Sequence, residues 1–373
     1  MYKKVLFKIH LVLGLTAGIV LLVVGLTGSL LSFDKEILHF VNQDSYIVEI
    51  SDKKRLSTKE LLEKFKEKFP QSKVNGITFS KDLKSTVVIN IAGSKGKAKR
   101  RGINYYINPY TAEVLPNVEG QGFFKFIENI HRRLAAGDVG KQIVGASVLC
   151  LLLLMFSGVY IYWPRVKRAF FKSFTFSFKY KGRAFISAMH SAIGMWVIPF
   201  YLLASLTGLY WSYDFFNEAL HKISGVEKQR KVPRNKKPEV KRDLNNTKLK
   251  LNEIQETVEL FHTNIKDYTK ANFRFNNKKG VYSISYLEKT SVHERARNQV
   301  LIDINTKKIV KHEKFEDKPL NERLMKSILA LHTGEYFGLV GQIAMFISSL
   351  FMVLFTVTGF IMYFKRKRKK QKV

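Results

Sequence analysis

The sequence predicts a membrane α-helical protein with four transmembrane helices, arranged as two tandem repeats that each carry a small exported α+β domain. Four apolar runs are long enough to cross a bilayer, which needs ~20 residues of helix; they lie at about residues 10–33, 142–163, 187–211 and 340–364. The chain of 373 residues has a net charge of +33, yet 46% of it is hydrophobic. Those two values conflict for a soluble protein and agree for a basic membrane protein.

The repeat is visible in both pairs of apolar runs. The first and third runs match at an offset of 180 and share His10, Gly14, Leu26, Thr27, Gly28, Ser32 and Asp34 with His190, Gly194, Leu206, Thr207, Gly208, Ser212 and Asp214. The second and fourth runs match at an offset of 201 and share His131, Gly137, Gly140, Gly158, Tyr162 and Arg165 with His332, Gly338, Gly341, Gly359, Tyr363 and Arg366. The chain therefore reads as two copies of one unit: helix out, α+β domain, helix in.

The charge distribution predicts the orientation. Residues 1–8, 164–185 and the tail after 364 are rich in Lys and Arg and contain no acidic residue. The positive-inside rule places these segments in the cytoplasm and both long loops outside. Because topology explains much of the positive charge, we do not expect a nucleic-acid partner. The single cysteine, Cys150, excludes an intramolecular disulfide.

The predicted organisation follows from these boundaries. In chain order it comprises transmembrane helix 1 (1–34), a first exported domain (35–130), transmembrane helix 2 (131–165), a cytoplasmic loop (166–185), transmembrane helix 3 (186–214), a second exported domain (215–331), and transmembrane helix 4 with a basic cytoplasmic tail (332–373).

The first exported domain should contain one helix and three strands. Ser57 and Glu60 have the spacing of a capping box, and the helix they open should stop before Pro70. Strands are predicted at 74–79, 86–91 and 105–108, with a basic turn at 95–101.

The second exported domain should follow the same plan. It opens with a linker rich in Lys, Arg and Pro at 228–242 and continues with a helix at about 251–263. Strands are predicted at 271–276, 280–286 and 298–304.

Four histidines recur between the halves. His10 and His190 begin outgoing helices and should lie at the cytoplasmic edge, whereas His131 and His332 precede incoming helices and should lie at the outer edge. An ionisable residue in a membrane helix usually has a function. Two facing imidazoles beside glycines suit a planar iron porphyrin with two axial histidines, so a haem near each face would give electrons a route across the bilayer.

Structural roles compete with this interpretation. A single interfacial histidine is usually only hydrogen-bonded, and duplication can preserve a packing device as well as a ligand. Arg132 and Arg133 could hold haem propionates or could simply flank a helix. The remaining histidines do not pair between the halves and are interpreted as surface residues, with the first two as reserve ligands: His39, His221, His262, His293 and His312.

At these residues the chain resembles the PepSY-associated transmembrane proteins. The resemblance rests on Leu-His-x3-Gly at the start of the third helix, Leu-Thr-Gly at the ends of the first and third, Trp-Pro-Arg at 163–165 and Leu-His-Thr-Gly at 331–334. It implies two PepSY-like domains outside the membrane. Some members of the family are haem-b reductases that release iron from siderophores.

The resemblance implies a function and its site. We expect an inner-membrane di-haem b protein that reduces periplasmic ferric siderophores or other ferric chelates, with membrane quinol or a cytoplasmic flavoprotein as electron donor. The haem ligands would be His10 with His190 and His131 with His332, and Gly14 and Gly194 would let the rings approach. A regulator of periplasmic proteases and a non-redox scaffold of an iron-uptake system are the alternatives. No catalytic constellation is expected in either loop.

Overall fold

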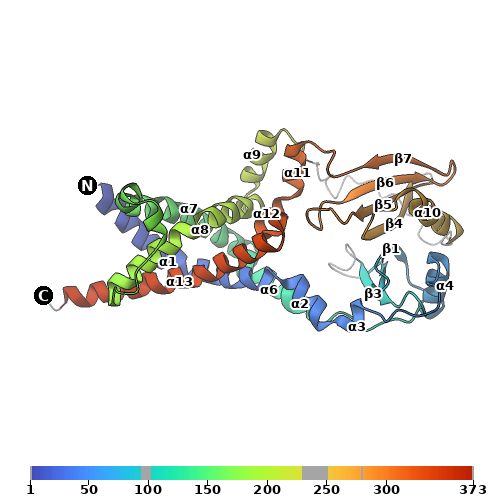
Figure 1. The fold of residues 1–373 in the computed structure, drawn as a ribbon, viewed down its shortest axis with the longest axis horizontal. Helices are drawn as coiled ribbons and strands as arrows, with labels where there is room; N and C mark the ends of the chain where they lie inside the picture. Colours follow the sequence, from blue (N-terminus) through green and yellow to red (C-terminus); the bar gives the residue numbers. More distant parts are fainter. Residues whose placement is uncertain (1, 94–101, 229–250, 279, 372–373) are drawn as a thin grey trace. The chain divides into compact units, whose positions relative to one another are not determined.

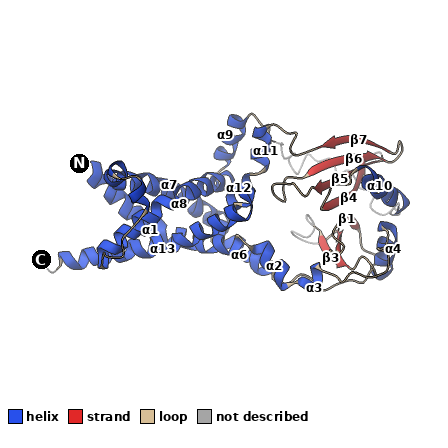
Figure 2. Ribbon diagram, in the orientation of Figure 1, coloured by secondary structure: helices blue, strands red, loops and turns tan. Residues whose placement is uncertain are grey.

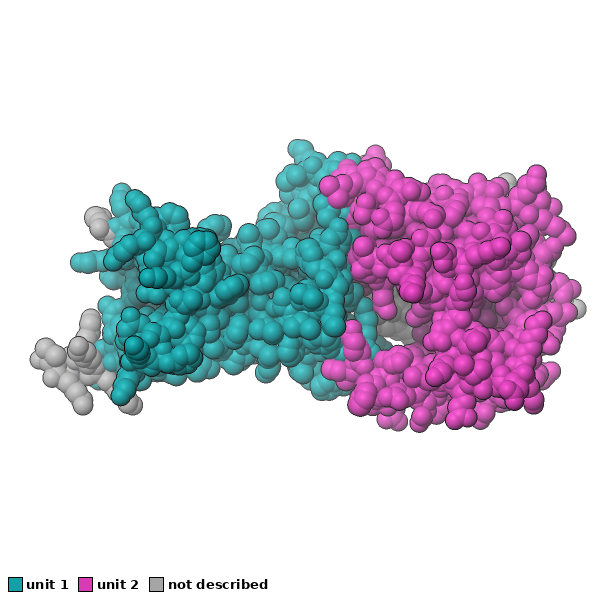
Figure 3. Space-filling view, in the orientation of Figure 1, with its two compact units in different colours: residues 1–35, 120–226, 324–373 teal, residues 36–119, 227–323 magenta. Residues whose placement is uncertain are grey.

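A computed structural model describes residues 2–93, 102–228, 251–278 and 280–371. The predicted basic turn 95–101 and nearly all of the predicted linker 228–242 lie outside the described residues. The chain forms two compact units (Figure 3). The helical unit comprises Met1–Lys35, Gly120–Val226 and Leu324–Val373, and the sheet unit comprises Glu36–Glu119 and Glu227–Arg323.

Four long helices form the helical unit (Figure 1). They are α1 (Tyr2–Leu31), α7 (Gly137–Arg168), α8 (Gly182–Ser212) and α13 (Gly338–Lys370). All four are long and apolar enough to cross a membrane, as the sequence predicts, so the chain is a multi-pass membrane protein. Helices α1 and α8 each pack against both α7 and α13.

Small residues let these helices pack closely. A Cβ added at Gly25 of α1 would lie only 2.6 Å from the Cβ of Met352 in α13 and would collide with it. Thr356 of α13 donates a hydrogen bond of 3.0 Å to the carbonyl of Gly18 in α1. Close approach and hydroxyl-to-carbonyl bonds are how helices associate where lipid removes the hydrophobic driving force.

Short helices flank the long ones. They are α2 (Asp34–Val41), α3 (Gln43–Tyr46), α6 (Gln121–Arg133), α9 (Asp214–Ser224), α11 (Leu320–Lys326) and α12 (Ile328–Thr333), together with the 3-10 turns η1 (Phe171–Phe174) and η2 (Glu335–Phe337). The sequence boundaries at 131 and 332 differ from this, because both histidines lie on separate short helices, α6 and α12.

Turns in the left-handed region separate these short helices from the long ones. Leu134 and Ala135 have φ of 49° and 56°, and Gly334 has φ of 84°. Just beyond each turn, the long helix has a glycine, Gly140 or Gly341, whose added Cβ would meet the backbone of the preceding turn. These glycines hold the histidine-bearing segments tightly against the long helices.

The sheet unit contains one antiparallel sheet of seven strands in the order β3-β2-β1-β4-β5-β6-β7 (Figure 2). The strands are β1 (Val74–Ser80), β2 (Val87–Ile91), β3 (Ile103–Ile107), β4 (Lys270–Lys278), β5 (Val281–Leu287), β6 (Asn298–Asp303) and β7 (Lys308–Glu313). Six strands match the predicted ones to within a few residues, and β7 was not predicted.

The two segments that the sequence predicts as separate domains join in this sheet. Strand β1 of the first segment pairs with β4 of the second, with Ile77 opposite Phe273 and Phe79 opposite Ala271. A Cβ at Gly76 would overlap the carbonyl oxygen of Phe273, so the junction needs a glycine there. Each half keeps its own helix and strands, and the halves meet edge to edge.

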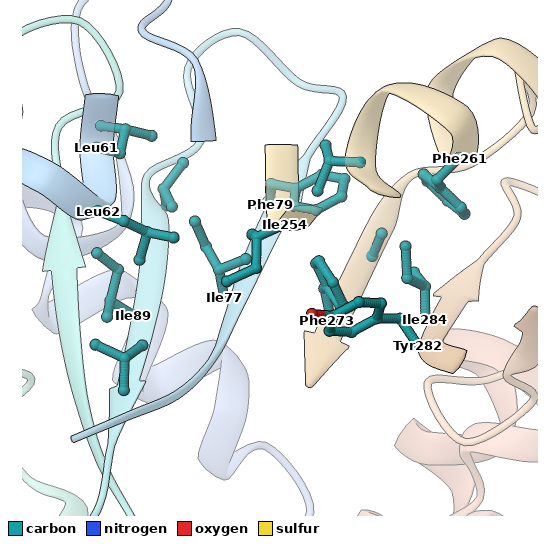
Figure 4. Close-up of a cluster of buried hydrophobic side chains, with 14 of the residues drawn as sticks. Leu61, Leu62, Ile77, Phe79, Ile89, Ile254, Phe261, Phe273, Tyr282 and Ile284 are labelled. Carbon is teal, nitrogen blue, oxygen red and sulfur yellow. The ribbon is translucent and has the colours of Figure 1, made fainter. Parts of the chain in front are cut away.

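One hydrophobic core spans this junction (Figure 4). Helices α4 (Thr58–Lys68) and α10 (Leu251–Asn264) contribute side chains such as Leu62 and Phe261, which are 0% exposed. These pack with Ile77, Ile89, Phe273 and Ile284 from the strands. The predicted capping box opens α4: the Glu60 amide donates to Ser57 Oγ over 3.2 Å, and the Ser57 amide donates to Glu60 Oε2 over 2.7 Å.

Candidate functional site

His131 and His332 lie side by side in the helical unit. Their ring centroids are 6.2 Å apart, with an angle of 70° between the ring planes. His131 is in the last turn of α6 and His332 in the last turn of α12. The two turns described above therefore bring together two imidazoles that are 201 residues apart in the sequence, from opposite halves of the chain.

The surroundings of His131 and His332 keep the imidazoles neutral. Burial, and then proximity to His131, lower the pKa of His332 to about 4. The pKa of His131 is also lowered by desolvation. Trp211 of α8 covers His332 edge-on, with ring centroids 5.4 Å apart. Neutral imidazole is the form that binds a metal ion.

His10 of α1 and His190 of α8 form the corresponding pair at the other end of the long helices. They are close enough to interact electrostatically. Phe355 of α13 packs edge-on against His190, with centroids 5.0 Å apart. Both pairs therefore take one histidine from each half of the chain, as the repeat predicts.

Each of the four histidines contacts a hydroxyl residue that is followed by glycine on a neighbouring long helix. We call this dipeptide a hydroxyl–glycine seat. The Nδ1 distances are 2.9 Å from His10 to Ser157 Oγ, 3.2 Å from His131 to Thr27 Oγ1, 2.7 Å from His190 to Thr358 Oγ1 and 2.9 Å from His332 to Thr207 Oγ1. The glycines that follow are Gly158, Gly28, Gly359 and Gly208.

The seats fix which nitrogen carries the proton. Each hydroxyl donates its own proton to a carbonyl three or four residues earlier in its helix, so it accepts from Nδ1. At His131 the carbonyl oxygen of Val24 also lies 3.0 Å from Nδ1, and a carbonyl can only accept. His10 and His332 have the same kind of bond, to Leu154 and Ala204. Nδ1 is therefore the donor in each ring.

This assignment leaves Nε2 with a lone pair. None of the hydrogen bonds among the described residues uses Nε2 of His10, His131, His190 or His332. A ring whose Nδ1–H is held by an acceptor and whose Nε2 is free is the usual arrangement of a metal-ligating histidine.

Three seat glycines provide the space that a ring needs. A Cβ at Gly28 would lie 3.1 Å from Cε1 of His131, one at Gly158 would lie 3.3 Å from Cε1 of His10, and one at Gly208 would lie 3.6 Å from Cε1 of His332. A residue larger than glycine would therefore push the first two rings away.

The other predicted site residues lie outside these contacts. Positions 14 and 194 face side chains, since a Cβ on Gly14 would meet Leu154 and one on Gly194 would meet Phe355, both at 3.9 Å. Arg132 pairs with Glu128 at 2.8 Å, and Arg133 pairs with Asp138 at 3.5 Å, both at the surface. The two arginines would have to exchange these partners to hold a propionate.

The unpaired histidines have other contacts. His39 is exposed and stacks on Tyr46, and both nitrogens of His221 have partners, Tyr210 and Val226. His262 and His312 are exposed, as predicted, and bond to tyrosines. His293 is the exception to the surface prediction: it is 7% exposed and packs on Phe315, while its Nδ1 accepts from the Arg295 amide.

Sequence reasoning missed the hydroxyl partners Ser157 and Thr358. Their signal was available, because a Ser-Gly or Thr-Gly dipeptide occurs at 27–28, 157–158, 207–208 and 358–359, once in each long helix at corresponding places. The repeat includes both residues at 27–28 and 207–208 but only the glycines at 158 and 359, since Ser157 and Thr358 differ in type.

The residues present fit a haem with two axial histidines. Two imidazoles that bind one metal ion through nitrogens at about 2 Å have ring centres roughly 6 Å apart, which agrees with the 6.2 Å between His131 and His332. The free Nε2 atoms would hold the iron, and the seat hydroxyls would accept the hydrogen bonds that orient the rings.

A comparison with protein families gives a match. The model of a family described as the PepSY-associated TM region matches residues 7–366, almost the whole chain. No curated protein matches the chain.

Proposed function

The chain belongs to the PepSY-associated transmembrane family, and we propose that it is an inner-membrane di-haem b protein that reduces ferric siderophores in the periplasm. The observation that carries the proposal is the set of four seated histidines, which form two pairs with Nε2 free in each ring. Two such pairs, one from each end of the long helices, are what a transmembrane electron path requires.

The residues have separate roles in this proposal. His10 and His190 would hold one haem at the cytoplasmic end, and His131 and His332 would hold the other at the periplasmic end. A bound haem supplies reversible one-electron transfer. A bilayer core is ~30 Å thick, so a carrier near each face divides the distance.

The chain's own contribution is to position the ligands and keep them neutral. The seats orient the rings through Nδ1, and all four rings are only partly exposed. A neutral imidazole pair suits both oxidation states of iron, because it adds no charge to be compensated within the membrane. The repeated halves place equivalent ligands at both ends.

The acceptor is inferred from charge. The basic residues of the two segments that form the sheet unit outnumber their acidic residues, and many ferric chelates are anionic, so electrostatic attraction favours their encounter. Reduction to Fe(II) lowers the charge on the iron and weakens its hold on hard oxygen ligands. No acid–base residue is needed for that release. Electrons would come from membrane quinol or a cytoplasmic flavoprotein.

The test uses the purified full-length protein. It is reduced without oxygen, ferric siderophores are added one at a time, and haem reoxidation is followed together with capture of Fe(II) by a chelator. We expect both signals with at least one ferric siderophore and neither with the iron-free siderophore. Reoxidation by oxygen or quinone alone would remove the siderophore reductase function, and a protein without haem would remove the electron-transfer function as well.

A further inference from the structure

The connection between α7 and α8 has an unusual composition. It contains seven cations and six aromatic residues between positions 165 and 183, and no acidic residue: Arg165, Lys167, Arg168, Lys172, Lys179, Lys181 and Arg183, and Phe170, Phe171, Phe174, Phe176, Phe178 and Tyr180. We call residues 165–183 the basic hairpin. All seven cations are exposed, and Phe171 and Phe178 are 84% and 81% exposed.

The basic hairpin is folded back onto the two long helices that it joins. Its Lys172 carbonyl accepts from Arg165 Nη2 at 3.0 Å, and its Ser173 carbonyl accepts from Tyr162 Oη at 3.2 Å. Its Phe174 carbonyl accepts from Trp196 Nε1 of α8 at 3.0 Å. Ser173 is consequently 0% exposed. These bonds keep the hairpin backbone beside α7 and α8.

This position puts the basic hairpin at the depth of the membrane surface. Tyr162 and Trp196 both belong to candidate membrane spans, and Phe174 packs on Trp196 with ring centroids 5.3 Å apart. Tryptophan and tyrosine at the ends of spans sit at the level of lipid headgroups. Tyr162 lies in the last two turns of α7, so the Ser173 carbonyl that it bonds must lie at or next to that level. Trp196 lies near the middle of α8 and holds the Phe174 backbone against that span.

We propose that the basic hairpin is a binding surface for anionic phospholipids. Phe171 and Phe178 would enter the boundary between headgroups and acyl chains, while Lys172, Lys179 and Lys181 would contact phosphate groups. Two observations favour lipid over an acidic protein. The exposed rings lie beside membrane-spanning residues, and none of the ion pairs of the described residues involves these three lysines, which leaves their charge available to headgroups.

The proposal does not depend on haem. Full-length protein is freed of lipid in a neutral detergent, and phosphatidylglycerol or phosphatidylcholine is titrated while bound lipid is counted by native mass spectrometry. Wild type should bind the anionic lipid in preference. The variant with Lys172→Gln, Lys179→Gln and Lys181→Gln should bind phosphatidylglycerol at least about tenfold more weakly than wild type. Each cation near an anionic surface contributes appreciably to the binding free energy.

Two further variants separate the contributions. Lys365→Gln with Lys367→Gln removes two exposed cations near the C-terminal end of α13. These cations do not lie on a folded-back segment with exposed aromatic residues, so this variant should leave the affinity within about twofold. Phe171→Ser with Phe178→Ser should weaken the binding of both phosphatidylglycerol and phosphatidylcholine. Equal affinity of wild type for the two lipids, or unchanged phosphatidylglycerol binding by the triple lysine variant, would overturn the proposal and leave a protein partner as the occupant.

Discussion

The helical unit and the sheet unit both join the two halves of the chain, but they do so with different chemistry. In the sheet unit, backbone bonds between β1 and β4 join the halves above an apolar core that includes Phe273 and Phe261, both 0% exposed. In the helical unit, imidazoles and hydroxyls lie where the halves meet.

This difference has a physical meaning. Strand pairing satisfies backbone groups across the junction, so the sheet core can be entirely apolar. Long helices satisfy their own backbone, and close packing with hydroxyl-to-carbonyl bonds is enough to hold them together in lipid. We therefore interpret half-buried imidazoles with oriented nitrogens as a binding site and not merely a packing device. The comparison is tested by changing each kind of junction separately.

The largest expected effect comes from the histidines. Alanine at His10 or His190 should remove one haem per chain, and alanine at His131 or His332 should remove the other, because a haem with one axial protein ligand is held weakly here. Haem content is measured as the pyridine complex, and a redox titration shows which haem is lost. His312→Ala is the control, since that exposed ring bonds only to Tyr286 among the described residues.

Two results would contradict the pairing. If wild type held a single haem, one of the two histidine pairs would not be a haem site. If all four alanine variants retained two haems with unchanged titrations, neither pair would be. Loss of both haems in every variant would instead show that the two sites fold together.

A core substitution in the sheet unit should have a large effect of another kind. Phe273→Ala removes a fully buried ring at the β1–β4 junction and should lower the free energy of unfolding of the sheet by about 3–5 kcal/mol. Phe275 lies on the same strand but is only partly buried, so Phe275→Ala should lower the free energy of unfolding by less. Thermal melting followed by circular dichroism measures the loss, and haem content should not change. Haem loss in Phe273→Ala would show that the helical unit depends on the sheet unit.

The sequence predicted features that local patterns encode. Length and hydropathy are local, and so four spans were found; Ser57 and Glu60 are three residues apart, and so their capping box was found. The pairing of β1 with β4 was not, because which edge strands pair depends on residues about two hundred positions apart. The turns that separate His131 and His332 from the long helices were also missed, since Leu134 and Ala135 carry no glycine signal for a positive φ.

The candidate site was predicted to a similar depth. Duplication identified all four histidines and the seat glycines, because identical residues at identical spacing are visible without a structure. The hydroxyls were less visible, since Ser157 and Thr358 are chemically equivalent but not identical. The roles of Arg132 and Arg133 could not be decided from their positions in the sequence, because only the structure shows their carboxylate partners.

A smaller effect should follow from changing a seat without changing a ligand. His190 has the shortest contact of the four, 2.7 Å to Thr358, and, unlike the other three rings, has no backbone carbonyl bond among the described contacts. Thr358→Val should therefore alter its haem more than Thr207→Val alters that of His332. A hydrogen bond is worth about 1 kcal/mol net, or roughly 40 mV for one electron.

Redox titration of the full-length protein measures these shifts. Thr356→Val is the matched control, because it lies on the same helix and its hydroxyl bonds to the carbonyl of Gly18 instead of a histidine. It should leave both midpoint potentials in place. A Thr356→Val shift as large as that of Thr358→Val would show that helix packing, and not the seat, sets the potential.

The smallest expected effect is a pH dependence confined to the sheet unit. The backbone amide of Ser57, and then its hydroxyl, hold the pKa of the Glu60 carboxyl below its ordinary value. A carboxyl with a depressed pKa in the folded state stabilises the fold above its unfolded pKa of about 4.3, and that contribution disappears as pH falls through the folded value. Glu60→Gln should therefore lower the melting temperature of the sheet at pH 6 and have a smaller effect near pH 3, because wild type loses the same charge as pH falls through the folded pKa. Circular dichroism of full-length protein at both values measures the difference, and a difference of equal size at pH 3 would show that the charge on Glu60 does not stabilise α4. The helical unit should show no such dependence on this residue, since its histidine seats are neutral hydrogen bonds and the capping box lies wholly in the sheet unit.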